Sequence, residues 1–294
     1  MPIRPRRSVL YMPGSIVRAL EKARSLAADA LILDLEDSIA PDLKAVARDN
    51  VCAAVTAGGY GHRELVIRIN SLSGPWGRDD LAAAVKAAPN AVLLPKVSTP
   101  GDIMLVAKEM RDLGASDDLA IWAMMETPLA ILNADSIVRT AADPSSRLAV
   151  LVMGTNDIAK DTRARLTKGR ASMVTWLSIC VAAARAHGVE ILDGVFNDIA
   201  DTDGFREECE QGRDFGMDGK TVIHPSQLAI CNDIFSPSSD ELAWAHKLIA
   251  AFDLPENANK GAISLDGRMV ERLHAEMAKR TLELDAAIAK MQLA

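Results

Sequence analysis

Eight short apolar runs, separated by stretches with helical spacing, constrain the fold of this chain more than any other feature. The runs are Ser8–Met12, Ala30–Leu35, Leu65–Ile69, Ala91–Val97, Leu119–Met125, Leu148–Met153, Glu190–Val195 and Lys220–Ile223. Several are almost continuously apolar, as in Val150-Leu151-Val152, which is typical of parallel strands covered on both faces. Because strand and helix alternate eight times, the sequence predicts an α/β fold of the (β/α)8 TIM-barrel type.

A doubly wound parallel sheet is the alternative arrangement for alternating strands and helices. Such sheets usually have fewer strands, and they often carry a glycine-rich phosphate-binding loop after the first strand. Here that position reads Tyr11-Met12-Pro13-Gly14-Ser15, which is not such a loop. The barrel is therefore the favoured prediction.

The pattern changes after Ile223, and the rest of the chain is typical of a helical extension. A linker at 235–239 precedes a helix of about a dozen residues, a glycine-containing loop at 259–267 and a final helix from about Met269 to Met291. We therefore expect a catalytic barrel at 1–235 and a C-terminal helical extension at 236–294. One face of the final helix carries the apolar residues Met269, Leu273, Met277, Leu284 and Ile288. That face must be buried, and we expect it to pack partly on a neighbouring subunit, which implies an oligomer.

Composition excludes several functional classes. Lys and Arg total 33 against 40 Asp and Glu, so the net charge of −7 offers no general surface for nucleic acid. No apolar run approaches the roughly 18 residues of a membrane span, and the N-terminus does not resemble a signal peptide. The four cysteines form no CxxC pair, which favours a reducing compartment. We expect a cytoplasmic protein with no nucleic-acid or membrane partner.

Charged side chains gather where the predicted strands end. In a (β/α)8 barrel the reacting groups lie at the carboxyl ends of the strands. The residues found there are Glu36, Asp37, Arg68, Lys96, Glu126, Asp157 and His224. Because these ends converge on one mouth, the sequence predicts a site that holds several carboxylates with an Arg and a Lys.

The carboxylates in this group indicate a hard cation. Clustered carboxylates without Cys or paired His suit Mg²⁺, which takes one or two protein carboxylates and leaves its other positions to water and substrate. We predict Glu126 and Asp157 as direct ligands. Glu36 and Asp37 would then hold metal-bound waters or orient the ligands.

Each of these side chains also has an ordinary structural interpretation. Glu36, Asp37 or Asp157 could cap a helix or pair with a cation, and Arg68 could form an ion pair at the barrel rim. The ammonium of Lys96 could extend into solvent. For His224, hydrogen bonding within its own loop is the favoured role. The joint occurrence at strand ends is what indicates function.

The ordered series of motifs at these strand ends resembles the citrate lyase β-subunit-like group of the HpcH/HpaI aldolase superfamily. The motifs are Arg7–Gly14, Leu33–Ser38, Val66–Asn70, Leu94–Lys96, Met125–Pro128 and Val222–Gln227. The resemblance covers nearly the whole chain. It implies a (β/α)8 barrel, a trimer or a dimer of trimers, and Mg²⁺-dependent chemistry on β-hydroxyacyl thioesters.

The resemblance also implies roles for individual residues. Glu126 and Asp157 would hold the metal, and Arg68 would contact the thioester or carboxylate oxygens of the substrate. Backbone N–H groups near Gly154 and Thr155 would bind the carboxylate of a keto acid. The turn at 154–157 reads Gly-Thr-Asn-Asp, where Gly-Ala-Glu-Asp is common in the family.

The C-terminal extension carries a further candidate catalytic residue. Longer members of the family have a segment that closes over the active site of a neighbouring subunit, and its Asp acts as an acid or base. The matching carboxylate here is Glu271, which is one methylene longer. A shift of about 1 Å in such a group can cost roughly 100-fold in rate.

These observations predict a Mg²⁺-dependent carbon–carbon lyase that cleaves or forms a short 3-hydroxyacyl-CoA, such as malyl-CoA or citramalyl-CoA. The products of cleavage would be acetyl-CoA and a 2-keto acid. Arg68 would stabilise the enolate, and Glu271 of a neighbour would exchange the proton. Arg18, Lys22 and Lys96 are candidates for binding the anionic CoA.

Three alternatives keep the same fold. The first is a malyl-CoA-type thioesterase, which would hydrolyse the thioester. The second is a metal-dependent aldolase on free hydroxy-keto acids, which would not bind CoA. The third is a citrate lyase β subunit that needs partner proteins, although the long C-terminal tail favours a standalone enzyme.

Overall fold

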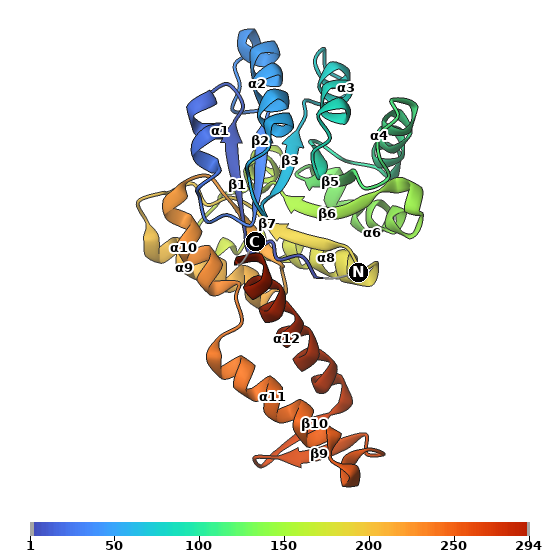
Figure 1. Ribbon diagram of the computed structural model, residues 1–294, viewed down its shortest axis with the longest axis vertical. Helices are drawn as coiled ribbons and strands as arrows, with labels where there is room; N and C mark the ends of the chain where they lie inside the picture. The colour runs from blue at the N-terminus through green and yellow to red at the C-terminus, as the bar shows by residue number, and fades with distance from the viewer. Residues whose placement is uncertain (1–2, 293–294) are drawn as a thin grey trace. The chain divides into compact units, whose positions relative to one another are not determined.

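The computed structural model describes residues 3–292 and contains a closed barrel of parallel strands. The strands are β1 (Ser8–Pro13), β2 (Ala30–Asp34), β3 (Glu64–Arg68), β4 (Ala91–Leu94), β5 (Ala120–Met125), β6 (Leu148–Met153), β7 (Glu190–Asp193) and β8 (Gly219–Val222). Each strand pairs in parallel with the next, and β1 pairs with β8 to close the ring. One strand corresponds to each predicted apolar run, so the predicted (β/α)8 fold is confirmed (Figure 1).

Helices follow the strands and cover the outside of the barrel. They are α1 (Val17–Ala23), α2 (Lys44–Ala57), α3 (Gly77–Ala87), α4 (Pro100–Asp112), α5 (Pro128–Leu132), α6 (Ala134–Val138), α7 (Thr155–Thr162), α8 (Val174–Ala186), α9 (Thr202–Asp214) and α10 (Leu228–Ile234). Local signals set several of the starts. Thr99 and Asp102 form a capping box at the start of α4, and Thr127 accepts a hydrogen bond from the backbone N–H of Ala130 at the start of α5.

Two apolar layers explain why the strands show no alternation. A smaller cluster comes from every second strand residue and fills the inside of the barrel, with Ile32, Val66 and Trp122 among its members. A larger cluster joins the other strand residues to the helices, as with Leu31, Ala47 and Leu177. Both faces of each strand are therefore buried.

Ion pairs close the lower end of the barrel, where the strands begin. The guanidinium of Arg6 pairs with Glu64, the first residue of β3, at 2.6 Å, and also with Glu190, the first residue of β7. Its Cζ lies 5.3 Å from the ring centroid of Trp122. The amino ends of the strands are thus closed by side chains, and a substrate could enter only at their carboxyl ends.

A second group of charges is buried beside β7 and β8. Asp193 and Lys220 are fully buried, and their charged atoms lie 2.8 Å apart. Arg170 binds the other oxygen of Asp193 at 2.7 Å, and Glu208 binds Lys220 at 2.7 Å. We call Arg170, Asp193, Glu208 and Lys220 the buried ion cluster.

Within the described residues the chain divides into two compact units, one at Arg6–Phe235 and a C-terminal unit from Ser236 onward that also takes in residues 3–5. The C-terminal unit contains α11 (Ser239–Asp253), β9 (Ala262–Leu265), β10 (Arg268–Glu271) and α12 (Arg272–Gln292). Its own core includes Leu248, Phe252 and Val270. Ser238 and Glu241 form a capping box at the start of α11, the helix expected after the linker.

The prediction for residues 259–271 was wrong. This segment forms an antiparallel hairpin of β9 and β10 instead of a loop followed by a helix, and the helix begins at Arg272. Asp266 and Gly267 both have positive φ, at 50° and 74°, as the two central residues of a type I′ turn require. An Asp-Gly pair between short apolar segments is the sequence signal for such a hairpin.

The apolar stripe predicted on the final helix is only partly buried by this chain. Met269 lies in β10 and not in the helix. Within α12, Ile288 is buried, whereas Leu273 is 50% exposed and Met277 is 64% exposed. Packing of this face on a neighbouring subunit remains a prediction. No helix among residues 3–292 is long and apolar enough to cross a membrane.

Candidate active site

The carboxyl ends of the strands surround a cavity of about 320 Å³, which we call the mouth cavity. Residues from β1, β2, β3, β5 and β6 line it together with the loops that follow β6 and β7. Its polar lining residues include Asp34, Asp37, Arg68, Glu126 and Asp157. The mouth cavity therefore lies where a (β/α)8 barrel carries its active site.

Arg68 is held firmly at the end of β3. Its Nε and Nη2 atoms donate hydrogen bonds to the two oxygens of Asp34, at 2.6 and 2.7 Å. This bidentate pair follows from the register of the barrel, since Asp34 of β2 lies directly opposite Arg68 of β3. Burial favours the neutral form of Asp34, but the charge and hydrogen bonds of Arg68 outweigh it and lower the pKa of that carboxyl. The pair is therefore fully ionised.

The remaining nitrogen of Arg68 faces the loop after β2. Its Nη1 atom lies 2.9 Å from Oε2 of Glu36 and donates a hydrogen bond to Asp37 at 3.2 Å. The Glu36 contact is an ion pair without hydrogen-bond alignment, so this buried oxygen has no hydrogen-bond partner. Burial, which outweighs the charge of Arg68, raises the pKa of Glu36 to about 8. Glu36 can therefore hold a proton near neutral pH.

Tyr11 lies against the guanidinium of Arg68. The Cζ atom of Arg68 is 5.0 Å from the centre of the Tyr11 ring, within the range of a cation–π contact. The sulfur of Met124 lies 3.8 Å from Nη1 of Arg68. An aromatic face, a thioether and a carboxylate thus fix the position of this one cation.

Glu126 and Asp157 lie on either side of Lys96. The Nζ atom of Lys96 pairs with Asp157 and lies 3.7 Å from Oε1 of Glu126. The side chain of Glu126 is 1% exposed, and its Oε1 accepts a 2.7 Å hydrogen bond from the backbone N–H of Lys96. Burial raises the pKa of Glu126 against the opposing charge of Lys96.

A glycine allows the β6 loop to approach Glu126 closely. A Cβ atom on Gly154 would lie 2.3 Å from the Cβ of Glu126 and 2.8 Å from its Oε2. Gly154 immediately precedes α7, so the first N–H groups of that helix, from Thr155 onward, have no partner within the helix. These N–H groups and the helix dipole can bind an anion next to the carboxylates.

The carboxylates fit a hard divalent cation in number and kind. Among residues 3–292 there is no cluster of three or more His, Cys, Asp or Glu side chains around one point. Mg²⁺ does not require one, because it is commonly bound by one or two carboxylates and several waters. Glu126 and Asp157 already face a single positive charge, and Glu36 adds a buried oxygen without a hydrogen-bond donor.

Comparison with known proteins decides the family. Residues 7–225 match the HpcH/HpaI aldolase/citrate lyase family. The chain belongs to this family. A (3S)-malyl-CoA thioesterase of Cereibacter sphaeroides is 49% identical over 97% of this chain and 96% of its own length. An L-malyl-CoA/beta-methylmalyl-CoA lyase of the same species is 33% identical over 92% of this chain and 91% of its own length.

A solved structure extends the similarity to the three-dimensional fold. The protein CitE of Mycobacterium tuberculosis, in complex with magnesium, acetoacetate and coenzyme A, has a TM-score of 0.75 and 28% identity. The match covers 94% of this chain and 96% of CitE. The chain is thus an enzyme of the HpcH/HpaI aldolase/citrate lyase family.

In this family member the structure brings together most of the predicted site residues. Arg68, Glu126, Asp157, Gly154 and Thr155 line the mouth cavity. Asp37 lines it as well, and Glu36 and Lys96 contact its lining residues.

Two predicted residues of the barrel unit lie outside the mouth cavity, and a third belongs to the C-terminal unit. Arg18 and Lys22 are exposed on α1, and neither lines the mouth cavity. Glu271 ends β10 in the C-terminal unit, and its backbone N–H donates a 2.9 Å hydrogen bond to Nδ1 of His274. His224 has the loop role that the sequence favoured, since its Nδ1 accepts a 3.2 Å hydrogen bond from the backbone N–H of Ser226.

Sequence reasoning missed several residues that shape the site. Asp34 and Tyr11 hold Arg68, as described above. Lys44 is buried, and its ammonium donates hydrogen bonds to the backbone oxygens of Leu35 and Glu36, at 2.9 and 2.8 Å. It therefore fixes the loop that carries Glu36. Asp34 belongs to the motif Leu33–Ser38, where the sequence pointed to Glu36 and Asp37 instead. Only the strand register, which places Asp34 opposite Arg68, shows its role.

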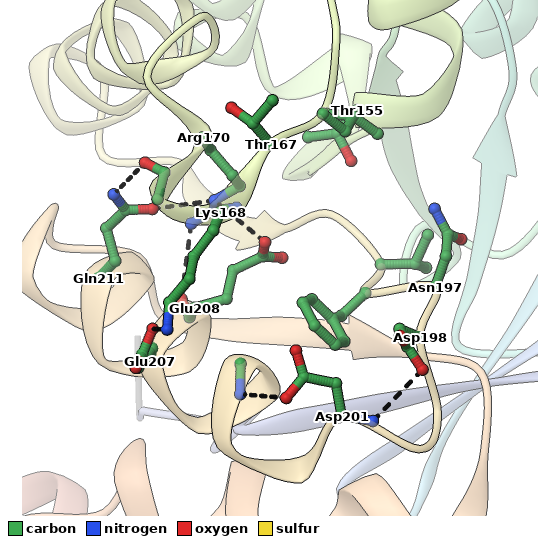
Figure 2. Close-up of a pocket in the computed structure, with 15 residues that line it drawn as sticks. Thr155, Thr167, Lys168, Arg170, Asn197, Asp198, Asp201, Glu207, Glu208 and Gln211 are labelled. Atoms are coloured by element: carbon green, nitrogen blue, oxygen red, sulfur yellow. Dashed lines mark hydrogen bonds and ion pairs between the residues drawn. The ribbon is translucent and has the colours of Figure 1, made fainter.

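A second cavity of about 310 Å³ lies next to the mouth cavity and shares Thr155, Val195 and Asn197 with it (Figure 2). Lys168 and Glu207 pair across its edge at 3.0 Å. Arg170 and Glu208 of the buried ion cluster also line it. The charged groups Lys168, Arg170, Glu207 and Glu208 that line it thus have partners within the protein.

Proposed function

We propose that this chain binds Mg²⁺ through Glu126 and Asp157 and acts on short β-hydroxyacyl-CoA thioesters of the malyl-CoA class. The placement of these two carboxylates beside Arg68, in one mouth, carries the proposal. The names of the relatives support it, since the thioesterase and the lyase both act on malyl-CoA. The magnesium and coenzyme A bound to CitE support the cofactor and the thioester.

Hydrolysis of the thioester is the reaction that we favour. The supporting observation is the 49% identity to the (3S)-malyl-CoA thioesterase over nearly the whole of both chains. Water would add to the thioester carbonyl carbon, the carbon–sulfur bond would break, and the CoA sulfur would leave with a proton. The products would be the free hydroxy acid and CoA.

Carbon–carbon cleavage is the second candidate, favoured by the lyase relative and by the family. Here the C3 hydroxyl would lose its proton, the adjacent carbon–carbon bond would break, and the electron pair would pass to the thioester enolate. Protonation of that enolate would give acetyl-CoA, and the other fragment would be a 2-keto acid. The sequence alone favoured this reaction. The same side chains of the mouth cavity would serve hydrolysis and carbon–carbon cleavage.

Each side chain in the mouth has a role that its surroundings support. Arg68 would bind the thioester oxygen as negative charge develops there, through the N–H groups that face Glu36 and Asp37. The first N–H groups of α7, at Thr155, would bind the carboxylate end of the substrate. When bound, Mg²⁺ would supply a Lewis acid that polarises a substrate oxygen.

Proton transfer requires a group that can change its protonation state near neutral pH. Glu36, with its pKa raised to about 8 by burial, meets this requirement inside the barrel unit. Glu271 is a second candidate, supplied by a neighbouring subunit of the trimer or hexamer that the sequence predicts. Arg18, Lys22 and Lys96 would attract the phosphates of CoA.

A product assay tests the proposal. Purified protein is mixed with (3S)-malyl-CoA and with citramalyl-CoA, with Mg²⁺ or with EDTA, and the products are separated by chromatography. Malate and free CoA indicate hydrolysis, whereas glyoxylate and acetyl-CoA indicate cleavage. A Glu126→Gln variant serves as the inactive control. Folded protein that consumes neither thioester with Mg²⁺ present contradicts the proposal.

A further inference from the structure

Lys96 follows β4 in a backbone conformation that lysine seldom adopts. Its φ is +56°, in the left-handed region that favours glycine. Its N–H donates to Oε1 of Glu126 at 2.7 Å, and its backbone oxygen accepts a 3.2 Å hydrogen bond from the hydroxyl of Ser98. The protein therefore holds an unfavourable conformation at this residue from both sides.

The consequence of this backbone is the direction of the side chain. The ammonium reaches from the end of β4 to the start of α7, where it pairs with Asp157. It also lies 3.7 Å from Oε1 of Glu126. The Lys96 side chain is 36% exposed, so one side of it faces solvent and the ammonium has room to leave.

The two carboxylates that Lys96 contacts are the proposed metal ligands. A divalent cation bound by Glu126 and Asp157 would lie between their oxygens, which is where the ammonium lies. Two positive charges cannot share this position, because their repulsion at contact distance is large inside a protein.

We propose that Lys96 is an internal counter-ion that competes with the divalent cation for Glu126 and Asp157. Metal binding displaces the ammonium, and the displaced ammonium is then available to an anionic group of the substrate. The metal thus binds before Lys96 can engage the substrate. This inference rests on the proposed metal site and specifies how that site is regulated.

Metal affinity tests the inference without any measurement of activity. The dissociation constants of Mg²⁺ and Mn²⁺ are measured by isothermal titration calorimetry on the full chain, for the wild type and for Lys96→Met, Lys96→Gly and Lys96→Arg. Lys108→Met is the matched control, because Lys108 pairs with Asp112 on the exposed face of α4. Thermal melting confirms that each variant is folded.

Lys96→Met and Lys96→Gly should bind either metal at least about tenfold more tightly than the wild type, because no cation has to be displaced. The glycine variant removes the same charge and relieves the backbone, so agreement between the two assigns the effect to the charge. Lys96→Arg and Lys108→Met should not gain affinity.

The outcomes separate the two proposals. Metal binding by the wild type with no gain in the Met and Gly variants overturns the counter-ion role and leaves the metal site intact. Metal binding by neither the wild type nor the variants overturns the metal site, and the counter-ion role with it. Binding that is measurable only in the Met and Gly variants supports competition.

Discussion

Glu36 combines burial with an incomplete set of partners. Its Oε2 atom has no hydrogen-bond donor, and the ion pair with Arg68 does not offset the cost of burying the charge. Its pKa is raised from 4.5 to about 8. Since the folded state holds this proton more tightly than the unfolded state, the free energy of unfolding falls as pH rises from about 4.5 to about 8.

Glu36→Gln should remove this loss of stability in metal-free protein. We compare the midpoints of thermal unfolding of the variant and the wild type. The variant's advantage in midpoint should grow by several degrees between pH 5 and pH 8, because each kcal/mol of stability corresponds to roughly 2–4 °C. Melting curves in EDTA across this range measure the difference. Glu109→Gln is a control, because Glu109 pairs with the exposed Arg78 and does not line the mouth cavity. A difference that does not change with pH would contradict the raised pKa.

Gly154 makes room for the carboxylate of Glu126. An added methyl group would lie 2.3 Å from the Cβ of Glu126, so that side chain or its loop must move. Gly154→Ala should lower kcat/KM by roughly 100-fold, the cost of a displacement of about 1 Å. Gly101→Ala, whose Cβ would lie no closer than 3.5 Å to Thr99, should leave kcat/KM unchanged. Equal kinetics for the two variants would show that Glu126 need not be fixed.

At the residue scale, strand position alone was enough to predict which side chains share the mouth cavity. Arg68 ends β3, Glu126 directly follows β5, and Asp157 lies in the first turn of α7 after β6, so all three line the mouth cavity. Asp34 was missed because its role depends on the alignment of β2 with β3, which no single strand reveals. Tyr11 was missed because an aromatic residue in a strand is ordinarily part of the core.

At the scale of elements, the buried ion cluster joins β7, β8, α9 and the segment before α8. Lys220 is fully buried and contacts two carboxylates. Removing one partner leaves the others buried and unbalanced, which costs about 3–5 kcal/mol. Lys220→Met should therefore lower the midpoint of thermal unfolding by roughly 10 °C.

Thermal melting of Lys220→Met beside Lys168→Met checks this value. Lys168 pairs with Glu207 where both side chains are more than half exposed, so its loss should change the midpoint little. Similar midpoints for the two variants would mean that the buried ion cluster adds nothing to stability.

Strands were easier to predict than the C-terminal hairpin. The eight barrel strands are covered on both faces, so their short runs are almost continuously apolar and differ clearly from the helical spacing around them. The strands β9 and β10 have four residues each, and most of their side chains are intermediate or exposed. The Asp266-Gly267 turn was therefore the stronger signal for a hairpin. The prediction instead assigned Met269 and the residues after it to the final helix.

At the scale of the whole molecule, each unit has a core of its own. Truncation after Phe235 should leave a folded barrel, because the apolar clusters of Arg6–Phe235 include no residue of the C-terminal unit. The truncated chain lacks Glu271, so it should lose activity on the thioester if Glu271 transfers the proton and should keep activity if Glu36 does. It should lose the predicted oligomeric state in either case. Circular dichroism, light scattering after gel filtration and the product assay measure these three properties.

Glu271→Gln in the full chain is the matched variant. It keeps the C-terminal unit and should keep the oligomeric state, while kcat falls by roughly 10²–10⁴-fold if Glu271 transfers the proton. A truncated barrel with full activity would exclude a catalytic role for the C-terminal unit.

The apolar cores of the barrel and the C-terminal unit share no residue, and this separation affects how the sequence can evolve. A substitution that loosens Leu248 or Phe252 removes contacts from the core of the C-terminal unit only, so we expect the barrel still to fold. The stretch around Phe235 and Ser236 is then a natural point for recombination between relatives. A barrel with one set of strand-end residues could acquire a different tail in a single genetic event, without repacking its interior.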